Sequence, residues 1–358
     1  PKRQVEIAPY VSSSFKIYEA EEGNPFADGN DFFINGGVDG KIGVTNDLIL
    51  DFAINPDFGQ VEADPSEVNL TAFETFFEEK RPFFIEGNSI TDYQLAPDGN
   101  PWSGDNLFYS RRLGRFPQYD INDDLSDSEY AKIPSNTRIL GALKLTGKTK
   151  RGLSVGLIES FTNEEFATID SLGNRRKEVI EPFTNYFAGR IQKDLNEGNT
   201  IIGGMFTSVN RKITEEQLEF LNSNALTGGI DFRQYFGEKK YFFWGTFTGS
   251  YINGSTAAMI NQQESSRRYF QRPDADQLHY DPTRRSMSGH GGNLILARQV
   301  FKGLNFTANI TWRSPGFETN DMGYVRMANT VLQFVNGGYN FTEPFSIFRS
   351  MNIYATQW

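Results

Sequence analysis

Apolar and polar residues alternate at every second position along much of the chain. In residues 304–312 the even positions are apolar and the odd positions are Asn or Thr. Residues 226–233 and 241–251 show the same alternation, as do residues 138–146, where Ile139 falls on the apolar face. Because neighbouring side chains of a strand point to opposite faces of a sheet, this period of two predicts β-strands.

These predicted strands are long. They run for about 10 to 13 residues, whereas a strand of a globular protein has about 5 to 6 and a membrane-spanning strand about 9 to 11. The polar face carries Asn, Thr, Ser, Gly, Asp and Arg. This composition is typical of the wet interior of a membrane barrel.

Short and long connections alternate between the predicted strands. Short turns are expected at residues 45–47, 148–151, 196–198, 237–239 and 301–303. Long connections are expected at about 20–31, 56–136, 161–182, 210–224, 253–287 and 313–322. Outer-membrane barrels join their strands in this way. The pattern therefore predicts an all-β fold, an antiparallel up-and-down transmembrane β-barrel that forms a single domain over residues 1–358. A large soluble sandwich or propeller is the alternative.

The predicted strands number about thirteen, from residues 6–20 to residues 347–358. Bacterial barrels have an even number of strands, and an open edge in lipid leaves backbone groups without hydrogen bonds. We therefore expect the barrel to be incomplete in this chain.

Composition narrows the classes of function. The chain has 45 acidic and 35 basic residues, which argues against a nucleic-acid partner. It has no Cys and two His, so a thiolate metal site is excluded and a histidine cluster is not expected. No cofactor and no metal are predicted. The sequence has no apolar run long enough for a transmembrane helix and no visible signal peptide.

The longest connection, residues 56–136, is rich in Phe and in carboxylates. A loop of this length is usually ordered by packing on something, and its aromatic rings need an apolar contact surface. We expect it to fold into or across the lumen as a constriction or lid, fixed by carboxylate–arginine pairs. The candidate residues of this network are Asp57, Glu62, Asp64, Glu74, Lys80, Arg81, Glu86, Arg111, Arg112 and Arg115.

Within this network, Arg111, Arg112 and Arg115 are expected to pair with Glu62, Asp64 or Glu86, and contact with a phosphate is the alternative. The acidic residues of this loop are candidates for acid and base chemistry on a glycoside, provided that two of them lie about 5 to 10 Å apart; they are Glu62, Asp64, Glu67, Glu74, Glu78, Glu79 and Glu86. The alternative is that they form salt bridges with Lys80 and Arg81 or lie in water.

A Ca²⁺ site is a further alternative. Asp28, Asn30, Asp31 and Asp39 offer oxygen ligands. Their spacing does not match the EF-hand, and such a loop is more often a turn.

Several motifs resemble those of one domain family of unknown function from Bacteroidota-type Gram-negative bacteria. They are NPDFGQVEADP at 55–65, EKRPFFIEG at 79–87, FYSRRLGR at 108–115, QRPDA at 271–275 and RSPGFETNDMG at 313–323. The resemblance implies an outer-membrane barrel, usually placed C-terminal to a module similar to family-9 carbohydrate-binding domains. That module is absent from this sequence. Some members of the family carry the label of hydrolase, but the resemblance assigns no catalytic residues.

Pattern and resemblance together predict a plugged or gated pore, or a membrane anchor or scaffold, in the outer membrane. The alternatives are a barrel-associated glycan hydrolase or carbohydrate-uptake component, and a structural subunit of a larger outer-membrane complex. The expected partner is outer-membrane lipid. Other outer-membrane or periplasmic proteins and glycans are further candidates.

Overall fold

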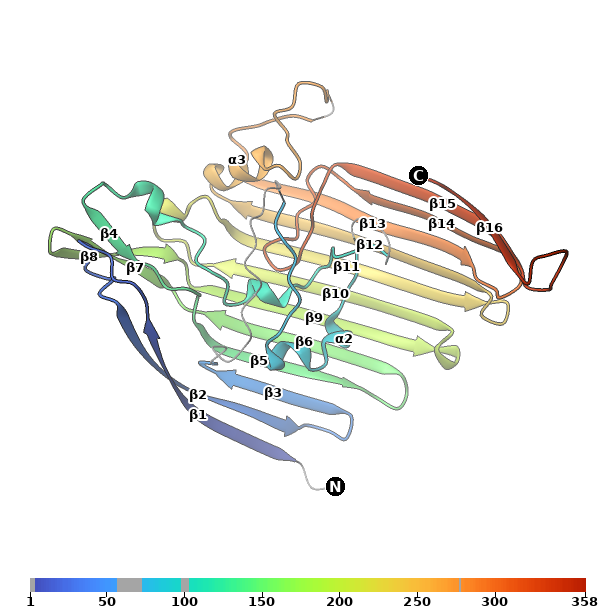
Figure 1. The fold of residues 1–358 in the computed structure, drawn as a ribbon, viewed down its shortest axis with the longest axis horizontal. Helices are drawn as coiled ribbons and strands as arrows, with labels where there is room; N and C mark the ends of the chain where they lie inside the picture. Colours follow the sequence, from blue (N-terminus) through green and yellow to red (C-terminus); the bar gives the residue numbers. More distant parts are fainter. Residues whose placement is uncertain (1–3, 57–72, 98–102, 277) are drawn as a thin grey trace.

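The computed structural model describes residues 4–56, 73–97, 103–276 and 278–358. Thirteen strands form one antiparallel sheet, in which each strand is hydrogen-bonded to the next along the chain (Figure 1). They are β1 (Val5–Ile17), β2 (Asn30–Gly43), β3 (Leu48–Ile54), β5 (Ile139–Lys148), β6 (Leu153–Thr162), β9 (Thr184–Leu195), β10 (Thr200–Arg211), β11 (Asn222–Phe236), β12 (Tyr241–Gly254), β13 (Ser286–Arg298), β14 (Gly303–Arg313), β15 (Thr330–Phe341) and β16 (Met351–Gln357).

The predicted architecture is confirmed. The sheet is all antiparallel, it runs up and down, and it has the expected thirteen strands. Each of the five predicted short turns joins two neighbouring strands. The last strand begins at Met351 rather than near residue 347. In the part of the chain that is described, β1 and β16 are the two edge strands of the sheet.

The two faces of the sheet differ as the alternation predicts. On β12 the side chain of Thr248 is fully buried, whereas the next residue towards the N-terminus, Phe247, is 52% exposed. On β11, Thr227 is buried and Ile230 is 67% exposed. The face that buries threonines is here called the inner face, and the face that exposes aliphatic and aromatic residues is called the outer face.

The predicted face of Ile139 is wrong. Register shifts between Ile139 and Gly141, because the extra residue Leu140 forms a β-bulge opposite β6. Ile139 therefore points to the inner face, where it is 4% exposed, while Leu143 stays on the outer face. A single inserted residue reverses the side of every position before it.

A second, three-stranded sheet lies within the long connections. It consists of β4 (Glu129–Lys132), β7 (Glu165–Ser171) and β8 (Asn174–Glu181). The connection expected at 161–182 is therefore mostly a hairpin. Its two-residue turn, Leu172–Gly173, has positive φ at both positions, which suits the right-handed twist of a hairpin.

Short helices complete the described elements. Three are α-helical, α1 (Pro82–Ile85), α2 (Asn88–Thr91) and α3 (Thr256–Glu264). Four are 3₁₀ turns, η1 (Ser110–Arg112), η2 (Ile121–Asp124), η3 (Asn196–Gly198) and η4 (Glu216–Leu218). Within the described residues, none of these helices is long and apolar enough to cross a membrane.

Candidate functional site

Two long connections fold back onto the inner face of the sheet. They are residues 73–97 and 103–115, before β5, and residues 314–329, before β15 (Figure 1). Together they are here called the inner layer. The backbone of Asn106 joins the two connections through a bridge with Tyr324, and it forms a second bridge with Gln94 of its own connection.

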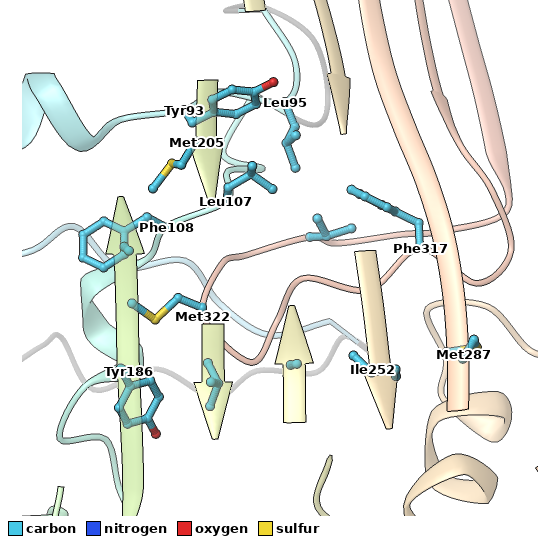
Figure 2. Close-up of a cluster of buried hydrophobic side chains, with 14 of the residues drawn as sticks. Tyr93, Leu95, Leu107, Phe108, Tyr186, Met205, Ile252, Met287, Phe317 and Met322 are labelled. Carbon is cyan, nitrogen blue, oxygen red and sulfur yellow. The ribbon is translucent and has the colours of Figure 1, made fainter. Parts of the chain in front are cut away.

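An apolar cluster lies between the inner layer and the sheet (Figure 2). The sheet contributes small or flexible side chains such as Ala188 and Met205, and the inner layer contributes larger ones. Figure 2 labels Tyr93, Leu95, Leu107, Phe108, Phe317 and Met322 of the inner layer with Tyr186, Met205, Ile252 and Met287 of the sheet. The aromatic residues of the long connection thus find their apolar contact surface on the inner face.

Polar contacts fix α1 and α2 against the sheet. Lys144 of β5 is buried, and its ammonium lies 3.2 Å from a carboxylate oxygen of Asp51 on the adjacent strand β3. The same ammonium donates to the carbonyl of Glu86 at 2.8 Å and lies 4.9 Å from the ring centre of Phe83. The ammonium of Lys144 therefore fixes α1 against the sheet.

Tyr93 makes a second contact halfway along the strands. Its hydroxyl donates to the carbonyl of Ile230 at 2.7 Å, and the guanidinium of Arg190 lies 4.8 Å from its ring centre. Arg190 also makes two hydrogen bonds to Asp231, at 2.5 and 3.1 Å. The hydroxyl of Tyr93 would lie 2.6 Å from a Cβ atom on Gly229, so this approach requires glycine.

Arg313, at the end of β14, makes a third contact. Its guanidinium lies 2.8 Å from a carboxylate oxygen of Asp105, and both side chains are 1% exposed. The other oxygen of Asp105 accepts the backbone N–H of Arg326. Burial raises the pKa of Asp105, and Arg313 offsets part of this rise.

Two of the predicted network residues form a pair with each other. Arg112 donates to both carboxylate oxygens of Glu74, at 2.6 and 2.8 Å, and its Nε donates to the carbonyl of Gly323. Burial opposes ionisation of Glu74, but Arg112 outweighs it and lowers the pKa of this carboxyl. The pair therefore lies within the first connection of the inner layer, and the hydrogen bond from Arg112 to Gly323 joins it to the second.

Arg81 lies in a second pair, with Glu79, one of the loop carboxylates expected to form salt bridges with Lys80 or Arg81. Its guanidinium lies 2.6 Å from Glu79 and donates to the carbonyls of Ser110 and Leu113 at 2.7 Å each. Glu79 also accepts from the hydroxyl of Ser110. These contacts lower the pKa of Glu79 against the effect of burial and hold the segment before α1 against η1.

The remaining predicted residues lie in other places. Glu86 pairs with Lys41 of β2 rather than with the arginine cluster, so the expected pairing of Glu86 is wrong. This follows from α1, which ends on the side of the sheet near β2 and β5. Arg111 donates to the backbone carbonyl of Glu78. The backbone N–H of Lys80 donates to the carboxylate of Glu79.

Asp57, Glu62 and Asp64 lie outside the described residues. Their pairing with the arginines stays a prediction.

A pocket of about 350 Å³ lies where four long connections meet. Arg112, Arg115 and Phe116 line it from the longest connection. The other walls come from the β10–β11 connection, from α3 and from the second connection of the inner layer. All of these connections lie at the end of the sheet opposite the short turns, so the pocket is at the long-loop end.

The acidic residues that line this pocket are held by buried arginines. Glu318 forms an ion pair with Arg268 and lies 3.7 Å from Arg267. Asp321 pairs with Arg211 at 2.5 Å. Burial alone would raise the pKa of Glu318, but Arg268 and Arg267 lower it to about 2.

Sequence reasoning missed most of these buried partners. Arg190 and Asp231 were placed on a polar face, but their pairing was not foreseen. The available signal was a charged residue at an inward position within a strand, since such a residue needs a partner. Glu318 and Asp321 stand within the motif at 313–323, where only the resemblance pointed to them.

The candidate Ca²⁺ residues make ordinary loop contacts. The side chain of Asp28 accepts the backbone N–H of Asn30, and Asp31 pairs with Lys132 at 3.3 Å. Among the residues placed by the structure, no three His, Asp or Glu side chains come together as a metal site.

Comparison with known proteins identifies a family. The model of a family described as "Domain of unknown function (DUF5916)" matches residues 1–357. No curated protein matches the chain.

Solved structures show distant likeness. A loop L8 deletion mutant of OmpT, an outer-membrane protein of Vibrio cholerae, is 9% identical with a TM-score of 0.32, over 94% of this chain and 98% of that chain. A porin refined at 1.8 Å resolution is 10% identical with a TM-score of 0.31, over 95% of this chain and 88% of that chain. The architecture given above therefore rests on the strand pairing of the chain itself.

Proposed function

The chain belongs to the DUF5916 family, a family of unknown function, and we propose that it is an outer-membrane β-barrel protein whose inner layer plugs a polar pore. The observation that carries this proposal is the depth of the inner layer. Tyr93 reaches Ile230, which lies in the middle of the strand β11. A loop that merely covered the mouth would not extend so far along the strands.

The outer face supports a position in the membrane. Its central positions on neighbouring strands carry exposed apolar residues, among them Ile191, Ile202, Phe206, Ile230, Phe247, Leu294 and Ile310. Exposed apolar area on this scale is unfavourable in water and is the surface that lipid chains cover. Lipid is therefore the partner of this face.

An aromatic pair lies on the outer face near the short-turn end of the sheet. The rings of Phe236 and Tyr241 stack with centres 5.2 Å apart. Tyrosine and phenylalanine rings form girdles at the two interfaces of a membrane barrel. These rings therefore suit the interface on the short-turn side.

The inner face can line a pore without the inner layer. Lys144 has a carboxylate partner, Asp51, on the adjacent strand, and Arg190 has Asp231 on β11. Because both cations are paired within the sheet, release of the inner layer leaves neither of them without a counter-charge. Arg211 and Arg313 of the sheet, in contrast, pair with Asp321 and Asp105 of the inner layer, so release would expose these two cations on the wall to water.

The hydrolase alternative is less well supported. A general acid needs a carboxyl with a raised pKa. Glu74 and Glu318, which line the pocket, both have lowered pKa values and are held by arginines. A role as a membrane anchor or as a subunit of a larger complex remains compatible with the same fold. The Bacteroidota-type source and the association with a carbohydrate-binding module stay predictions.

Single-channel recording in planar bilayers tests the plug. Residues 57–114 are replaced by a Gly-Ser linker in the natural protein that carries this domain. The strand pairing does not depend on the excised residues, since Ile54 and Gly141 are directly paired and the carbonyl of Arg115 accepts the backbone N–H of Thr137. The intact protein is expected to stay closed, and the shortened protein to conduct.

The control replaces residues 18–29, another long connection, by the same linker. Ile17 and Asn30 are paired, so this excision also leaves its hairpin closed, and it is expected to leave the pore shut. Equal conductance of the intact and shortened proteins would contradict the plug. If both insert into membranes and neither conducts, the barrel is an anchor or a scaffold instead.

A further inference from the structure

We propose that the pocket at the long-loop end binds a small hydroxylated carboxylic acid, such as a sugar acid, and that Arg115 holds its carboxylate. Arg115 lines this pocket. In the described part of the chain its guanidinium makes no hydrogen bond to the protein, and its Nε is buried without a partner. A guanidinium whose Nε is buried without a partner favours an anionic oxygen acceptor.

Arg115 differs in this respect from the other arginines around the pocket. Arg112 makes a bidentate contact with Glu74, Arg211 pairs with Asp321 and Arg268 pairs with Glu318. These side chains are already held in place by their carboxylates. Arg267 also lines the pocket and lies 3.7 Å from Glu318. Among the residues that the structure describes, Arg115 is therefore the cation of this pocket without a carboxylate at ion-pair distance.

The balance of charge indicates a ligand with a single negative charge. Among the described residues three arginines line the pocket, namely Arg112, Arg115 and Arg267, and Arg211 and Arg268 are paired with its carboxylates. Four described carboxylates oppose these five arginines, namely Glu74, Glu318, Asp321 and Glu181, which is bonded to Gln118 of the pocket wall. Over the described residues the difference of five and four is one positive charge. A carboxylate matches this excess better than a phosphate monoester, which carries about −1.5 to −2 at pH 7.

The rest of the wall suits a body rich in hydroxyl groups. Asn261 and Gln262 of α3 line the pocket, and carboxamides both donate and accept hydrogen bonds, as hydroxyl groups require. Phe116, 55% exposed, offers a ring face at the same pocket, and an aromatic face can cover the C–H face of a sugar. A volume of about 350 Å³ is near the lower end of the usual range for ligand pockets, roughly 300 to 1,000 Å³.

This proposal does not depend on conduction. The pocket is formed by the long connections, so it can bind a ligand whether the barrel is a pore or an anchor. If the titration shows no ligand binding, the plug proposal is therefore unaffected, and if the recording shows no current, the ligand proposal is unaffected.

The test is calorimetric titration of the intact protein in lipid nanodiscs with sodium D-glucuronate, D-glucose and inorganic phosphate. Glucuronate is expected to bind more tightly than either of the others. Arg115→Gln is expected to weaken glucuronate binding by roughly tenfold or more, since a charged hydrogen bond is lost, and Arg115→Lys is expected to restore part of it. The matched control is Arg272→Gln, which removes an exposed arginine paired with Asp274 outside this pocket.

A second variant covers the case in which Arg115→Gln does not fold. Asn261 makes one long contact, 3.5 Å, with the carbonyl of Phe220, so Asn261→Ala should leave the fold intact. It is expected to weaken glucuronate binding roughly two- to tenfold. Unchanged affinity in both pocket variants would overturn the proposal, and so would glucose or phosphate binding as tightly as glucuronate.

Discussion

The two faces of the sheet reverse the arrangement of a soluble protein. On β11 the outward Ile230 is 67% exposed, while its inward neighbour Gly229 lies beneath the hydroxyl of Tyr93. On β14 the outward Ile310 is exposed, whereas the inward Arg313 is almost completely buried. In water, a sheet buries its aliphatic side and exposes its charges. The reversal supports the proposed membrane position of the outer face, and it places buried charged residues beside the apolar cluster on the inner face.

Removing a charge from the inner face should cause the largest loss in the free energy of unfolding. Arg313→Gln leaves Asp105 buried without its cation, and loss of one partner of a buried pair costs about 3 to 5 kcal/mol. Urea unfolding in lipid nanodiscs, followed by tryptophan fluorescence, measures this loss in the free energy of unfolding. Because the pair joins the sheet to the inner layer, the variant should also leak current in planar bilayers.

Two controls belong to this measurement. Arg272→Gln breaks an exposed pair with Asp274 and should change the stability by less than about 1 kcal/mol. The double variant Arg313→Gln with Asp105→Asn should recover part of the loss, because two amides can bond to each other without a net charge. A single variant as stable as the wild type would show that the pair does not hold the inner layer.

Adding a charge to the outer face should have the next largest effect. Ile230→Lys places an ammonium near the middle of the apolar band, which should cost about 2 to 4 kcal/mol in lipid. The same measurement on Leu172→Lys, at the exposed tip of the β7–β8 hairpin, should show almost no loss. A lysine that is exposed to water does not lower the free energy of unfolding. If Ile230→Lys is neutral or stabilising, the outer face meets water and the membrane position is wrong.

The sequence predicts the sheet well because each strand shows its two faces in the local alternation of apolar and polar residues. Alternation needs only neighbouring residues, so residues 226–233 alone indicate which side faces lipid. No local residue pattern of this kind predicts the contacts of the inner layer. Tyr93 contacts Ile230 across 137 positions of the chain, and many tyrosines and carbonyls would satisfy the same chemistry. Only the three-dimensional arrangement selects this pair.

The errors in the prediction have similar causes. Ile139 was assigned to the wrong face because one bulged residue, Leu140, interrupts a regular pattern. Glu86 was assigned to the arginine cluster because charge alone does not distinguish those arginines from Lys41. Arg112 does hold a carboxylate of the same connection, but this is Glu74 and not one of the predicted partners Glu62, Asp64 and Glu86. Charge alone does not select among the carboxylates of one loop.

The smallest effect on the free energy of unfolding is expected from alanine substitutions at two neighbouring glycines, which lie on opposite faces of β11. At Gly229 an added Cβ would lie 2.6 Å from the hydroxyl of Tyr93, whereas at Gly228 the nearest atom would be 3.8 Å away. Gly229→Ala should therefore displace Tyr93 at a cost of about 1 to 3 kcal/mol, and Gly228→Ala should be close to neutral. Urea unfolding measures both variants, and faster proteolysis of the inner layer in Gly229→Ala alone would locate the damage. Equal stability of the two variants would mean that Tyr93 does not press on the inner face, and the plug would then lose its deepest contact.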